Sequence, residues 1–355
     1  MLIMAGGTGG HIFPGLAVAD SLRLQQVPVR WLGASGGMEC QRVPAAGFPL
    51  DVVNISSLRG KGLVRWLRLP LQLFRAVRQS FVLIGRHRPA CALSFGGYAA
   101  GPGGLAAWLR GVPLLVHEQN RIPGLTNRVL AHLAQRVLQA FPGTWPQGMH
   151  PVTRGNPVRQ AVAELPPPPV RLAQRSGKPH LLITGGSQGA RALNLVLPAA
   201  VALLSGAAVP EIRHQAGKEQ AGQTAAAYAA AGLEAQVDEF IEDMAAAYSW
   251  ADLVVCRAGA LTVSELAAAG VGSILVPFPF AVDDHQTRNA EVLVEAGAAS
   301  LLPEAACDAA ALARVLQPLL SDRAGLLRMA QAARALALPD SAAQVARDCM
   351  EFVMP

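Results

Sequence analysis

A histidine near the start of the chain directly follows a glycine-rich turn, a position that favours proton transfer. The turn Gly6-Gly7-Thr8-Gly9-Gly10 comes after a short apolar run, and His11 would lie in the first turn of the next helix. Because the positive end of a helix dipole disfavours the imidazolium cation, a neutral His11 could act as general base toward a sugar or alcohol hydroxyl. The alternative is a histidine that only caps or packs on the loop.

A second glycine turn, Gly185-Gly186-Ser187-Gln188-Gly189, follows the apolar run 180–184. Glycine allows positive φ angles and close approach of the backbone, and the helix that follows offers N–H groups to an anion. Such turns bind diphosphates, although each could also be only a tight connection from strand to helix. Neither turn has the Gly-x-Gly-x-x-Gly spacing of dinucleotide sites, and neither carries the lysine of a P-loop.

Polar side chains also gather where strands of an open α/β sheet would end, which is where such sheets bind ligands. The cluster His117-Glu118-Gln119-Asn120 follows one apolar run. Its spacing does not match a metal-binding helix, so we interpret it as a set of hydrogen-bonding groups for a polar ligand.

Two further clusters lie in the second half of the chain. In the segment from Arg257 to Glu265, a helix N-terminus would take a phosphate while Glu265 accepts hydrogen bonds from a ribose diol. The alternative is a capping box from Thr262 to Glu265. After another apolar run, Gln286 and Asn289 could hold sugar hydroxyls, whereas Asp283-Asp284 is typical of a solvated turn.

The elements that must position these residues alternate between short apolar runs and longer helical patterns, as in parallel α/β proteins. The predicted strands are residues 2–4, 29–32, 90–95, 114–117, 180–184, 253–256 and 273–276. A strand, a glycine turn and a helix occur once in each half, which predicts two Rossmann-like domains that face a cleft. The first would span residues 1–158, with a C-terminal helix of about 339–355 packing back on it, and the second residues 159–338.

The composition excludes several classes of protein. With 355 residues, 52% hydrophobic and 15% charged, the chain is typical of a folded globular protein rather than a disordered or collagen-like one. The five cysteines form no Cys-x-x-Cys pair, so we predict neither a disulfide framework nor a zinc site. This use of cysteine fits a protein of the reducing cytosol. We expect no signal peptide, and the uncharged stretch 89–109 is too rich in Gly and Pro for a transmembrane helix.

The charge is distributed unevenly along the chain. Residues 1–159 contain 17 of the 30 Lys and Arg but only 4 of the 24 Asp and Glu. One run without acids comprises Arg59, Lys61, Arg65, Arg68, Arg75, Arg78, Arg86 and Arg88. Such basicity suits an anionic membrane, a phosphate-bearing substrate or nucleic acid. The pattern of residues 63–84 predicts one helix, or two helices broken near Pro70. The apolar residues cover a wide side of this segment, which fits either docking to a membrane or an ordinary core helix with a charged outer face.

Together these segments resemble the MurG family of N-acetylglucosaminyltransferases over nearly the whole chain. The resemblance rests on seven segments in order: residues 6–11, 96–98 with 101–102, 117–120, 155–159, 185–190, 257–265, and 284–286 with Asn289. It implies a GT-B fold and transfer of N-acetylglucosamine from its UDP donor to the C4 hydroxyl of the muramoyl sugar on undecaprenyl diphosphate, with inversion. It implies no metal and no cofactor.

The resemblance also implies roles for individual residues. Arg159 and Ser187 would meet the donor diphosphate, the Ile241 backbone the uracil and Gln286 the hexose. The phosphate and ribose would be bound by Ala260, Leu261, Thr262, Val263, Ser264 and Glu265. On the acceptor side, Thr8, Gly9, Gly10 and Asn120 would complete the site. His11 would be the base on the face opposite the departing UDP, while helix dipoles and arginines stabilise the leaving diphosphate.

The same resemblance implies a peripheral protein of the cytoplasmic face of the inner membrane that acts in peptidoglycan biosynthesis, cell wall biogenesis, cell shape and cell division. Its expected partners are UDP-N-acetylglucosamine, undecaprenyl-diphosphate-linked muramoyl-pentapeptide, an anionic membrane surface and cell-wall synthesis proteins, with no nucleic acid. The alternatives are another GT-B glycosyltransferase acting on a glycolipid, a UDP-N-acetylglucosamine epimerase of similar fold, or a UDP-sugar-binding subunit without activity. An epimerase has no use for a basic, apolar face on its first domain, and the two half-sites argue against an inactive subunit.

Overall fold

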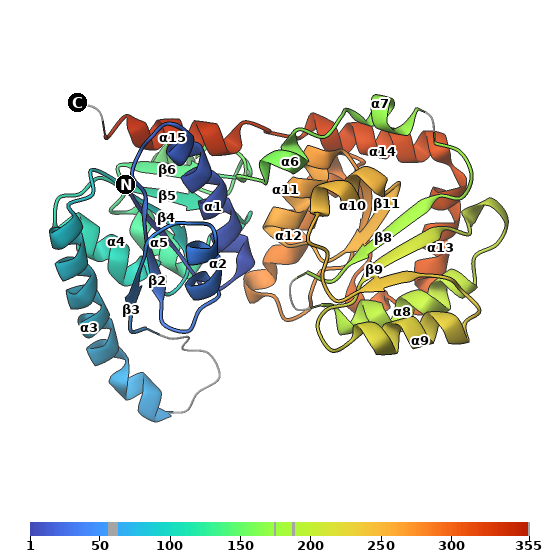
Figure 1. Ribbon diagram of the computed structural model, residues 1–355, viewed down its shortest axis with the longest axis horizontal. Helices are drawn as coiled ribbons and strands as arrows, with labels where there is room; N and C mark the ends of the chain where they lie inside the picture. Colours follow the sequence, from blue (N-terminus) through green and yellow to red (C-terminus); the bar gives the residue numbers. More distant parts are fainter. Residues whose placement is uncertain (56–62, 174, 187–188, 354–355) are drawn as a thin grey trace. The chain divides into compact units, whose positions relative to one another are not determined.

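The computed structural model describes residues 1–55, 63–173, 175–186 and 189–353. They divide into two units, which we call unit 1 (residues 1–159 and 338–355) and unit 2 (residues 160–337) (Figure 1). Within the described residues, each unit is a parallel β-sheet with helices packed against it. The expected α/β class with two Rossmann-like sheets is confirmed.

Unit 1 contains a seven-stranded sheet in its described part. The strands are β1 (Leu2–Ala5), β2 (Arg30–Ala34), β3 (Leu50–Val53), β4 (Ala92–Gly96), β5 (Leu114–Glu118), β6 (Arg136–Gln139) and β7 (Val152–Thr153). The helices are α1 (Gly9–Leu24), α2 (Glu39–Ala45), α3 (Leu63–His87), α4 (Ala100–Leu109), α5 (Leu125–Ala131), the 3₁₀ helix η1 (Gln147–Met149) and, from the end of the chain, α15 (Ser341–Met350).

Unit 2 contains a six-stranded sheet in its described part. The strands are β8 (His180–Thr184), β9 (Glu211–Gln215), β10 (Gln236–Asp238), β11 (Leu253–Cys256), β12 (Gly272–Leu275) and β13 (Ala299–Leu301). The α-helices are α6 (Gln160–Ala163), α7 (Pro168–Leu172), α8 (Arg191–Ala202), α9 (Ala221–Ala230), α10 (Met244–Trp250), α11 (Ala260–Ala269), α12 (His285–Glu295), α13 (Ala309–Ser321) and α14 (Arg323–Ala335). The 3₁₀ helices are η2 (Gly206–Ala208), η3 (Val282–Asp284) and η4 (Glu304–Ala306).

Both sheets have the strand order of a doubly wound fold. The order is β3-β2-β1-β4-β5-β6-β7 in unit 1 and β10-β9-β8-β11-β12-β13 in unit 2. The first strand of each unit therefore lies inside its sheet, next to the point where the strand order reverses. Ligands of open α/β sheets bind at this point, beyond the carboxyl ends of the strands, and each glycine turn follows that strand.

The central strands of unit 1 are almost continuously apolar because both faces of the sheet are buried. Along β1, Ile3 and Ala5 belong to one core cluster with residues of α1 and α15. Leu2 and Met4 belong to a second cluster with residues of α4. The sheet is thus held between two layers of helices, and the turn after β1 starts from a rigid base.

The seven predicted strands correspond to β1, β2, β4, β5, β8, β11 and β12. The structure adds β3, β6, β7, β9, β10 and β13, whose short sequences mix polar with apolar residues. Periodicity does not single out such strands, because they pair with a neighbouring strand without being fully buried.

Helix α3 is a single helix that contains Pro70 and packs against α4. Ala76, Ser80 and Ile84 are buried and repeat every four residues, so this side of α3 faces unit 1. Its other side exposes the apolar residues Leu71, Phe74 and Val82 together with Arg75, Arg78 and Arg86. Among the described residues, none of the helices has the length and apolar character needed to cross a membrane.

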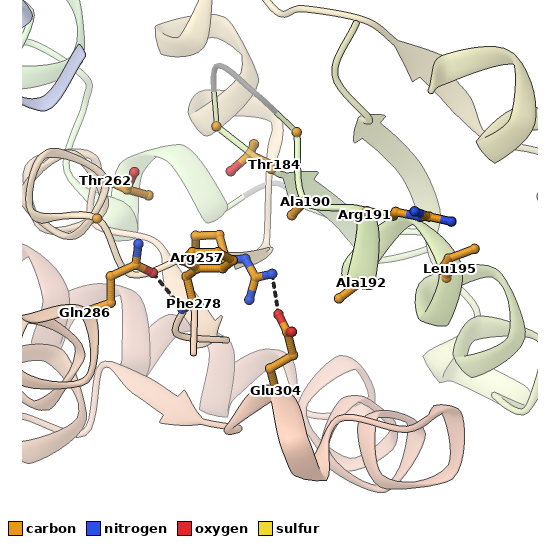
Figure 2. Close-up of a pocket in the computed structure, with 14 residues that line it drawn as sticks. Thr184, Ala190, Arg191, Ala192, Leu195, Arg257, Thr262, Phe278, Gln286 and Glu304 are labelled. Atoms are coloured by element: carbon orange, nitrogen blue, oxygen red, sulfur yellow. Dashed lines mark hydrogen bonds and ion pairs between the residues drawn. The ribbon is translucent and has the colours of Figure 1, made fainter. Parts of the chain in front are cut away.

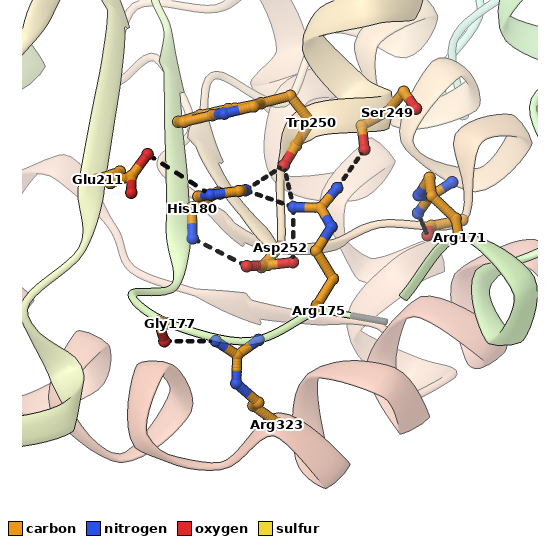
Figure 3. Close-up of polar contacts among 10 residues, drawn as sticks. Arg171, Arg175, Gly177, His180, Glu211, Ser249, Trp250, Asp252 and Arg323 are labelled. Carbon is orange, nitrogen blue, oxygen red and sulfur yellow. Dashed lines mark hydrogen bonds and ion pairs between the residues drawn. The ribbon is translucent and has the colours of Figure 1, made fainter. Parts of the chain in front are cut away.

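A buried ion pair joins the amino ends of two unit 2 strands (Figure 3). Asp252 accepts a hydrogen bond from the His180 backbone N–H at 2.9 Å and pairs with Arg175 at 3.2 Å. Arg175 also donates to the carbonyls of Ser249 and Trp250, and the His180 ring stacks on Trp250 with centroids 4.6 Å apart. This network fixes β8 beside β11, the two strands whose carboxyl ends lead into the site described next.

Candidate active site

A pocket of about 620 Å³ opens in unit 2 beyond the carboxyl ends of β8, β11 and β12 (Figure 2). Its walls come from the β8–α8 connection, the start of α11, the segment after β12, the first residue of η4 and Gln286 of α12. The pocket lies where the strand order of the unit 2 sheet reverses, which is the position expected for a ligand site in this topology.

Two helix N-termini face the pocket. Ala190 and Arg191 stand at the start of α8, and Gly259 and Thr262 at the start of α11, and all four line the pocket. The first backbone N–H groups of a helix have no partner within the helix, and the helix dipole adds positive charge there. Together with Arg257, these termini favour an anionic ligand such as a diphosphate.

The glycines of the β8–α8 turn are needed for its close packing. A Cβ atom added at Gly185 would lie 2.3 Å from the Ala190 nitrogen, and one at Gly189 would lie 2.4 Å from the Ala216 oxygen. Gly189 also has a φ of +74°, which side chains rarely allow. The Gln215 side chain donates to the Gly186 carbonyl at 2.9 Å. The described part of the turn is therefore held tightly, whereas Ser187 lies outside the described residues.

Arg257 is fixed on the wall of the pocket. Its guanidinium donates to the carbonyls of Val276 and Pro277 at 3.1 and 3.2 Å and forms an ion pair with Glu304 (Figure 2). It also lies 5.4 Å from the centroid of the Phe278 ring. The sequence motif contained Arg257, but Glu304 belongs to no motif. Its position directly after the last strand of the sheet is the signal that could have identified it.

Gln286 lines the pocket with a defined orientation. Its Oε1 accepts a hydrogen bond from the Phe278 backbone N–H at 2.9 Å. The side-chain nitrogen of Gln286 can then donate a hydrogen bond to a ligand, and a sugar hydroxyl can accept it. Asn289 is fully buried and donates to the Ala258 carbonyl at 3.4 Å. The structure therefore brings Gln286 to the pocket and places Asn289 in the interior.

Helix α11 begins at Ala260 with Gly259 as its N-cap, and Gly259 has no side-chain cap. The alternative of a capping box from Thr262 to Glu265 is therefore wrong, because a capping box starts at the N-cap, whereas Thr262 is the third residue of the helix and Glu265 the sixth. Among the predicted residues, Thr262 lines the pocket. Ala260, Val263 and Glu265 are buried, whereas Leu261 and Ser264 are half-buried.

Glu265 has an internal hydrogen bond. Its side chain is 5% exposed, and Oε2 accepts a hydrogen bond from the Tyr248 hydroxyl at 3.2 Å. The carboxylate is thus oriented by α10, which carries Tyr248. Ile241 is buried in the segment between β10 and α10. Its predicted backbone contact with uracil remains a prediction.

In unit 1, the glycine turn after β1 orients His11. Thr8 is the N-cap of α1, Gly9 and Gly10 are its first two residues, and His11 is the third. The His11 Nδ1 atom lies 3.1 Å from the Gly6 carbonyl oxygen and 3.4 Å from the Thr8 hydroxyl. Because a carbonyl only accepts hydrogen bonds, Nδ1 carries the proton of the neutral ring, and Nε2 is the basic nitrogen.

The cluster after β5 is mostly internal. The His117 Nε2 donates to the Gly155 carbonyl at 2.9 Å, and burial lowers the pKa of His117 to about 4. Gln119 donates to the His117 carbonyl at 2.8 Å and is 1% exposed. The interpretation of these side chains as ligand contacts is therefore wrong for both. They use their polar groups to hold the backbone between β5 and residue 155.

Glu118 organises the loop that carries Asn120. Its Oε1 accepts from the Asn120 N–H at 2.9 Å and from the Asn120 side chain at 3.1 Å. Its Oε2 accepts from Gly124 N–H at 3.1 Å and from Asn127 at 2.9 Å. Buried Glu118 is therefore a structural anchor, and the half-buried Asn120 is the member of this cluster that stays a candidate for ligand contact.

Arg159, predicted to meet the donor diphosphate, is the last residue of the first segment of unit 1. Its guanidinium lies 5.0 Å from the centroid of the Phe13 ring, and Phe13 is two residues beyond His11 on α1. The structure thus brings Arg159 close to the helix that begins at the first glycine turn. Among the described residues, no group of three or more His, Cys, Asp or Glu is arranged to hold a metal ion.

Comparison with known protein families finds two matches, one in each half of the chain. Residues 1–139 match the glycosyltransferase family 28 N-terminal domain, and residues 180–345 match the glycosyltransferase family 28 C-terminal domain. Unit 2 begins at Gln160, in the stretch between the two matches.

The chain is also similar to several curated and solved proteins. It is 58% identical over 346 residues to a protein of Xanthomonas campestris pv. campestris (strain B100), covering 98% of this chain and 80% of that protein. It is 53% identical over 351 residues to a protein of Nitrosococcus oceani, covering 99% and 98%. Both are named UDP-N-acetylglucosamine–N-acetylmuramyl-(pentapeptide) pyrophosphoryl-undecaprenol N-acetylglucosamine transferase. The crystal structure of Acinetobacter baumannii MurG matches with a TM-score of 0.86 and 40% identity over 99% of both chains.

Proposed function

The chain belongs to glycosyltransferase family 28, and we infer that it transfers N-acetylglucosamine from UDP-N-acetylglucosamine to the lipid-linked N-acetylmuramyl-pentapeptide of peptidoglycan synthesis. It is a glycosyltransferase of the GT-B fold, which consists of two Rossmann-like units. The names of its relatives favour this activity over the epimerase and over transfer to another glycolipid.

The observation that carries the proposal is the pocket of unit 2. Two helix N-termini and Arg257 give it a positive potential, and Gln286 offers a donor on its wall. This set of groups supports binding of a sugar nucleotide through its diphosphate and its hexose. Glu265 of α11, oriented by the hydroxyl of Tyr248 on α10, remains our candidate for the ribose hydroxyls.

We assign the acceptor to unit 1. The turn Thr8-Gly9-Gly10 presents the N-terminus of α1, and Asn120 stands in a loop braced by Glu118. These groups support binding of an acceptor that carries a diphosphate and a sugar, since the N–H groups at a helix N-terminus interact favourably with phosphate oxygens. The predicted contact of Arg159 with the donor diphosphate stays a prediction.

His11 is our candidate for the general base. In the proposed step, its Nε2 takes the proton of the acceptor C4 hydroxyl while that oxygen forms a bond to the anomeric carbon of N-acetylglucosamine. The bond from this carbon to the UDP oxygen breaks, and its electron pair leaves with UDP. Attack from the face opposite UDP inverts the anomeric carbon, and the helix N-termini and Arg257 stabilise the negative charge on the departing diphosphate.

The exposed side of α3 supports docking to an anionic membrane surface at the cytoplasmic face of the membrane. Leu71, Phe74 and Val82 are each more than half exposed, and Arg75, Arg78 and Arg86 flank them. Apolar side chains inserted at the lipid interface and arginines near anionic headgroups act together in such docking. The part of this basic run at Arg59 and Lys61 lies outside the described residues, and nothing is described of the side chains of Arg65 and Arg68.

The test is direct transfer of a labelled sugar. We would incubate the purified protein with radiolabelled UDP-N-acetylglucosamine and a short-chain lipid-linked muramoyl-pentapeptide, and separate the lipid fraction. Label in the lipid, unchanged by EDTA and largely lost in His11→Ala, is the expected result. Transfer by an unimpaired His11→Ala would assign the base to another residue. No label in the lipid, from protein that binds UDP-N-acetylglucosamine, would contradict the proposed function.

Membrane docking has its own test. Cosedimentation with vesicles containing phosphatidylglycerol should be strong, and weak with phosphatidylcholine alone. Phe74→Glu should reduce binding to the phosphatidylglycerol vesicles about tenfold, since an apolar contact with the lipid is lost and a charge that anionic lipid repels is added. Leu203→Glu is the matched control, because Leu203 is 59% exposed on unit 2. Equal loss in both variants would exclude α3 as the docking element.

A further inference from the structure

A buried carboxylate lies directly beneath the glycine turn that orients His11. Glu39, the first residue of α2, is fully buried. Its Oε2 accepts a hydrogen bond from the Gly7 N–H at 3.1 Å, and its Oε1 accepts one from the Ala34 N–H at 2.9 Å. A buried carboxylate is costly unless it is hydrogen-bonded, and these two backbone donors provide that compensation.

Three glycines make the space that this carboxylate occupies. A Cβ atom added at Gly6 would lie 2.2 Å from Glu39 Oε1, and one at Gly37 would lie 2.2 Å from Oε2. One added at Gly33 would lie 2.6 Å from the Glu39 Cγ. The Glu39 side chain is thus surrounded by glycines, and this close fit holds its carboxylate in one position against the turn.

The Gly6–Gly7 peptide group connects Glu39 to His11. The Gly7 N–H donates to the carboxylate of Glu39, and the Gly6 carbonyl, which belongs to the same peptide group, accepts from His11 Nδ1 at 3.1 Å. A hydrogen bond at one end of a peptide group polarises it and strengthens the hydrogen bond at the other end. The negative charge of Glu39 therefore acts on the imidazole through one planar peptide.

We propose that Glu39 is a positioning residue for His11, which fixes the Nδ1–H tautomer and raises the basicity of Nε2 through the Gly6–Gly7 peptide. No proton moves along this path: Nδ1 keeps its hydrogen, while Nε2 exchanges its proton with the acceptor. The proposal rests on the proposed function where it makes His11 the base. The tautomer and the basicity are properties of the protein without substrate.

Two further residues that are charged or can titrate contact this turn or helix α1, namely Tyr98 and Arg159. Tyr98 lies against Gly7, within 4 Å of where a Cβ of Gly7 would stand, and Arg159 lies beside Phe13 of α1.

The first test uses the unsubstituted protein. With nitrogen-labelled histidine, the resonances of His11 are identified by their loss in His11→Asn. We expect the neutral ring to carry its hydrogen on Nδ1, and the Gly7 amide proton to shift downfield as His11 becomes protonated, because both hydrogen bonds of the peptide then strengthen. A neutral ring with its hydrogen on Nε2 would overturn the proposal, even if no variant at Glu39 folds.

The second test removes the charge. Glu39→Gln is isosteric, and it should lower the pKa of His11 by about 0.5 to 1, since a nearby negative charge stabilises the imidazolium. The acid limb of kcat/KM should move to lower pH by the same amount, and kcat at its plateau should fall about 3- to 10-fold because the base is weaker. KM for UDP-N-acetylglucosamine should stay unchanged. An unchanged pKa of His11 in this variant would contradict the proposal.

A matched control separates this effect from general damage to unit 1. Asp51, on β3, is half-buried, and its carboxylate pairs with Arg30 at 3.1 Å and with His87 at 3.2 Å. Asp51→Asn should leave the pKa of His11 unchanged, and a shift equal to that of Glu39→Gln would overturn the proposal. If Glu39→Gln lowers the pKa of His11 while His11→Ala retains activity, the role of His11 as base fails and the action of Glu39 on it stands.

Discussion

Arg257 and Glu304 form an ion pair on the wall of the unit 2 pocket, and Arg257 is tied at the same time to the carbonyls of Val276 and Pro277. The side chains are 14% and 26% exposed, so water screens the pair only in part. Glu304 therefore both orients the guanidinium and cancels part of its charge in a pocket that we assign to a diphosphate.

Opposite effects on UDP binding should follow from removing either partner. Glu304→Gln keeps the shape of the side chain and removes its negative charge, so UDP should bind about 3- to 10-fold more tightly. Arg257→Ala removes the cation and should weaken binding about 10- to 100-fold. Isothermal titration calorimetry with UDP measures both. Weaker binding in Glu304→Gln would mean that orientation of Arg257 matters more than the net charge of the pocket.

A carboxylate at position 286 should impair the donor reaction. Gln286 accepts from the Phe278 N–H through Oε1, and a glutamate can keep this hydrogen bond while it replaces the donating amide nitrogen by a second oxygen. We expect Gln286→Glu to raise KM for UDP-N-acetylglucosamine about 10- to 100-fold, because a ligand hydrogen bond is lost and the diphosphate is repelled. Gln286→Met, similar in size and uncharged, is the control and should have the smaller effect.

The C-terminal helix should contribute strongly to the stability of unit 1. Asp348 of α15 is 1% exposed and accepts from Arg154 at 2.8 and 2.9 Å and from Arg136 at 3.0 Å. Asp348→Asn weakens charge-assisted hydrogen bonds to two arginines that stay partly exposed to water, so it should lower the free energy of unfolding by about 1 to 3 kcal/mol. Urea denaturation measures the change. The exposed Glu351, which also pairs with Arg136, is the control, and Glu351→Gln should leave stability nearly unchanged because water screens this pair.

The sequence predicts the centre of each unit well, for a physical reason. Strands such as β1 and β8 are buried on both faces, so they appear as continuous apolar runs, and the glycine turns that follow them have a local signature. The location of the unit 2 pocket at the end of these strands follows from the same rule of topology. His11 could be proposed as a site residue because it directly follows the first glycine turn. Thr262 and Gln286 could be proposed because each lies in the segment after a predicted strand.

The partners of these residues could not be predicted in the same way. Glu39 contacts the first glycine turn only because β1 and β2 pair in a register that brings Leu32 beside Met4, and Gly33 lies just beyond Leu32 on β2. Glu304 reaches Arg257 from 47 residues away. The polar run His117 to Asn120 looked like a ligand site because its residue types are the same for internal hydrogen bonding and for binding. Burial distinguishes the two, and burial depends on tertiary structure.

Acid should destabilise both units through buried histidines. Burial lowers the pKa of His117 in unit 1 and of His214 in unit 2 to about 4. An unfolded histidine titrates near 6.5, so between about pH 6.5 and 4 the unfolded chain binds protons that the folded protein does not. Stability is therefore complete above that range and falls as the pH decreases through it, by up to about 3 kcal/mol for each histidine.

Substitution of each histidine tests this assignment unit by unit. His117 donates to Gly155 and His214 to Asn194, so His117→Asn and His214→Asn should lower stability at pH 7. Each variant should also lose part of the dependence on pH, because one buried titrating group has been removed. Urea denaturation at intervals between pH 7 and pH 4.5 gives the slopes. A slope in His117→Asn equal to that of the unsubstituted protein would show that other groups, such as carboxylates with altered pKa values, cause the loss of stability in acid.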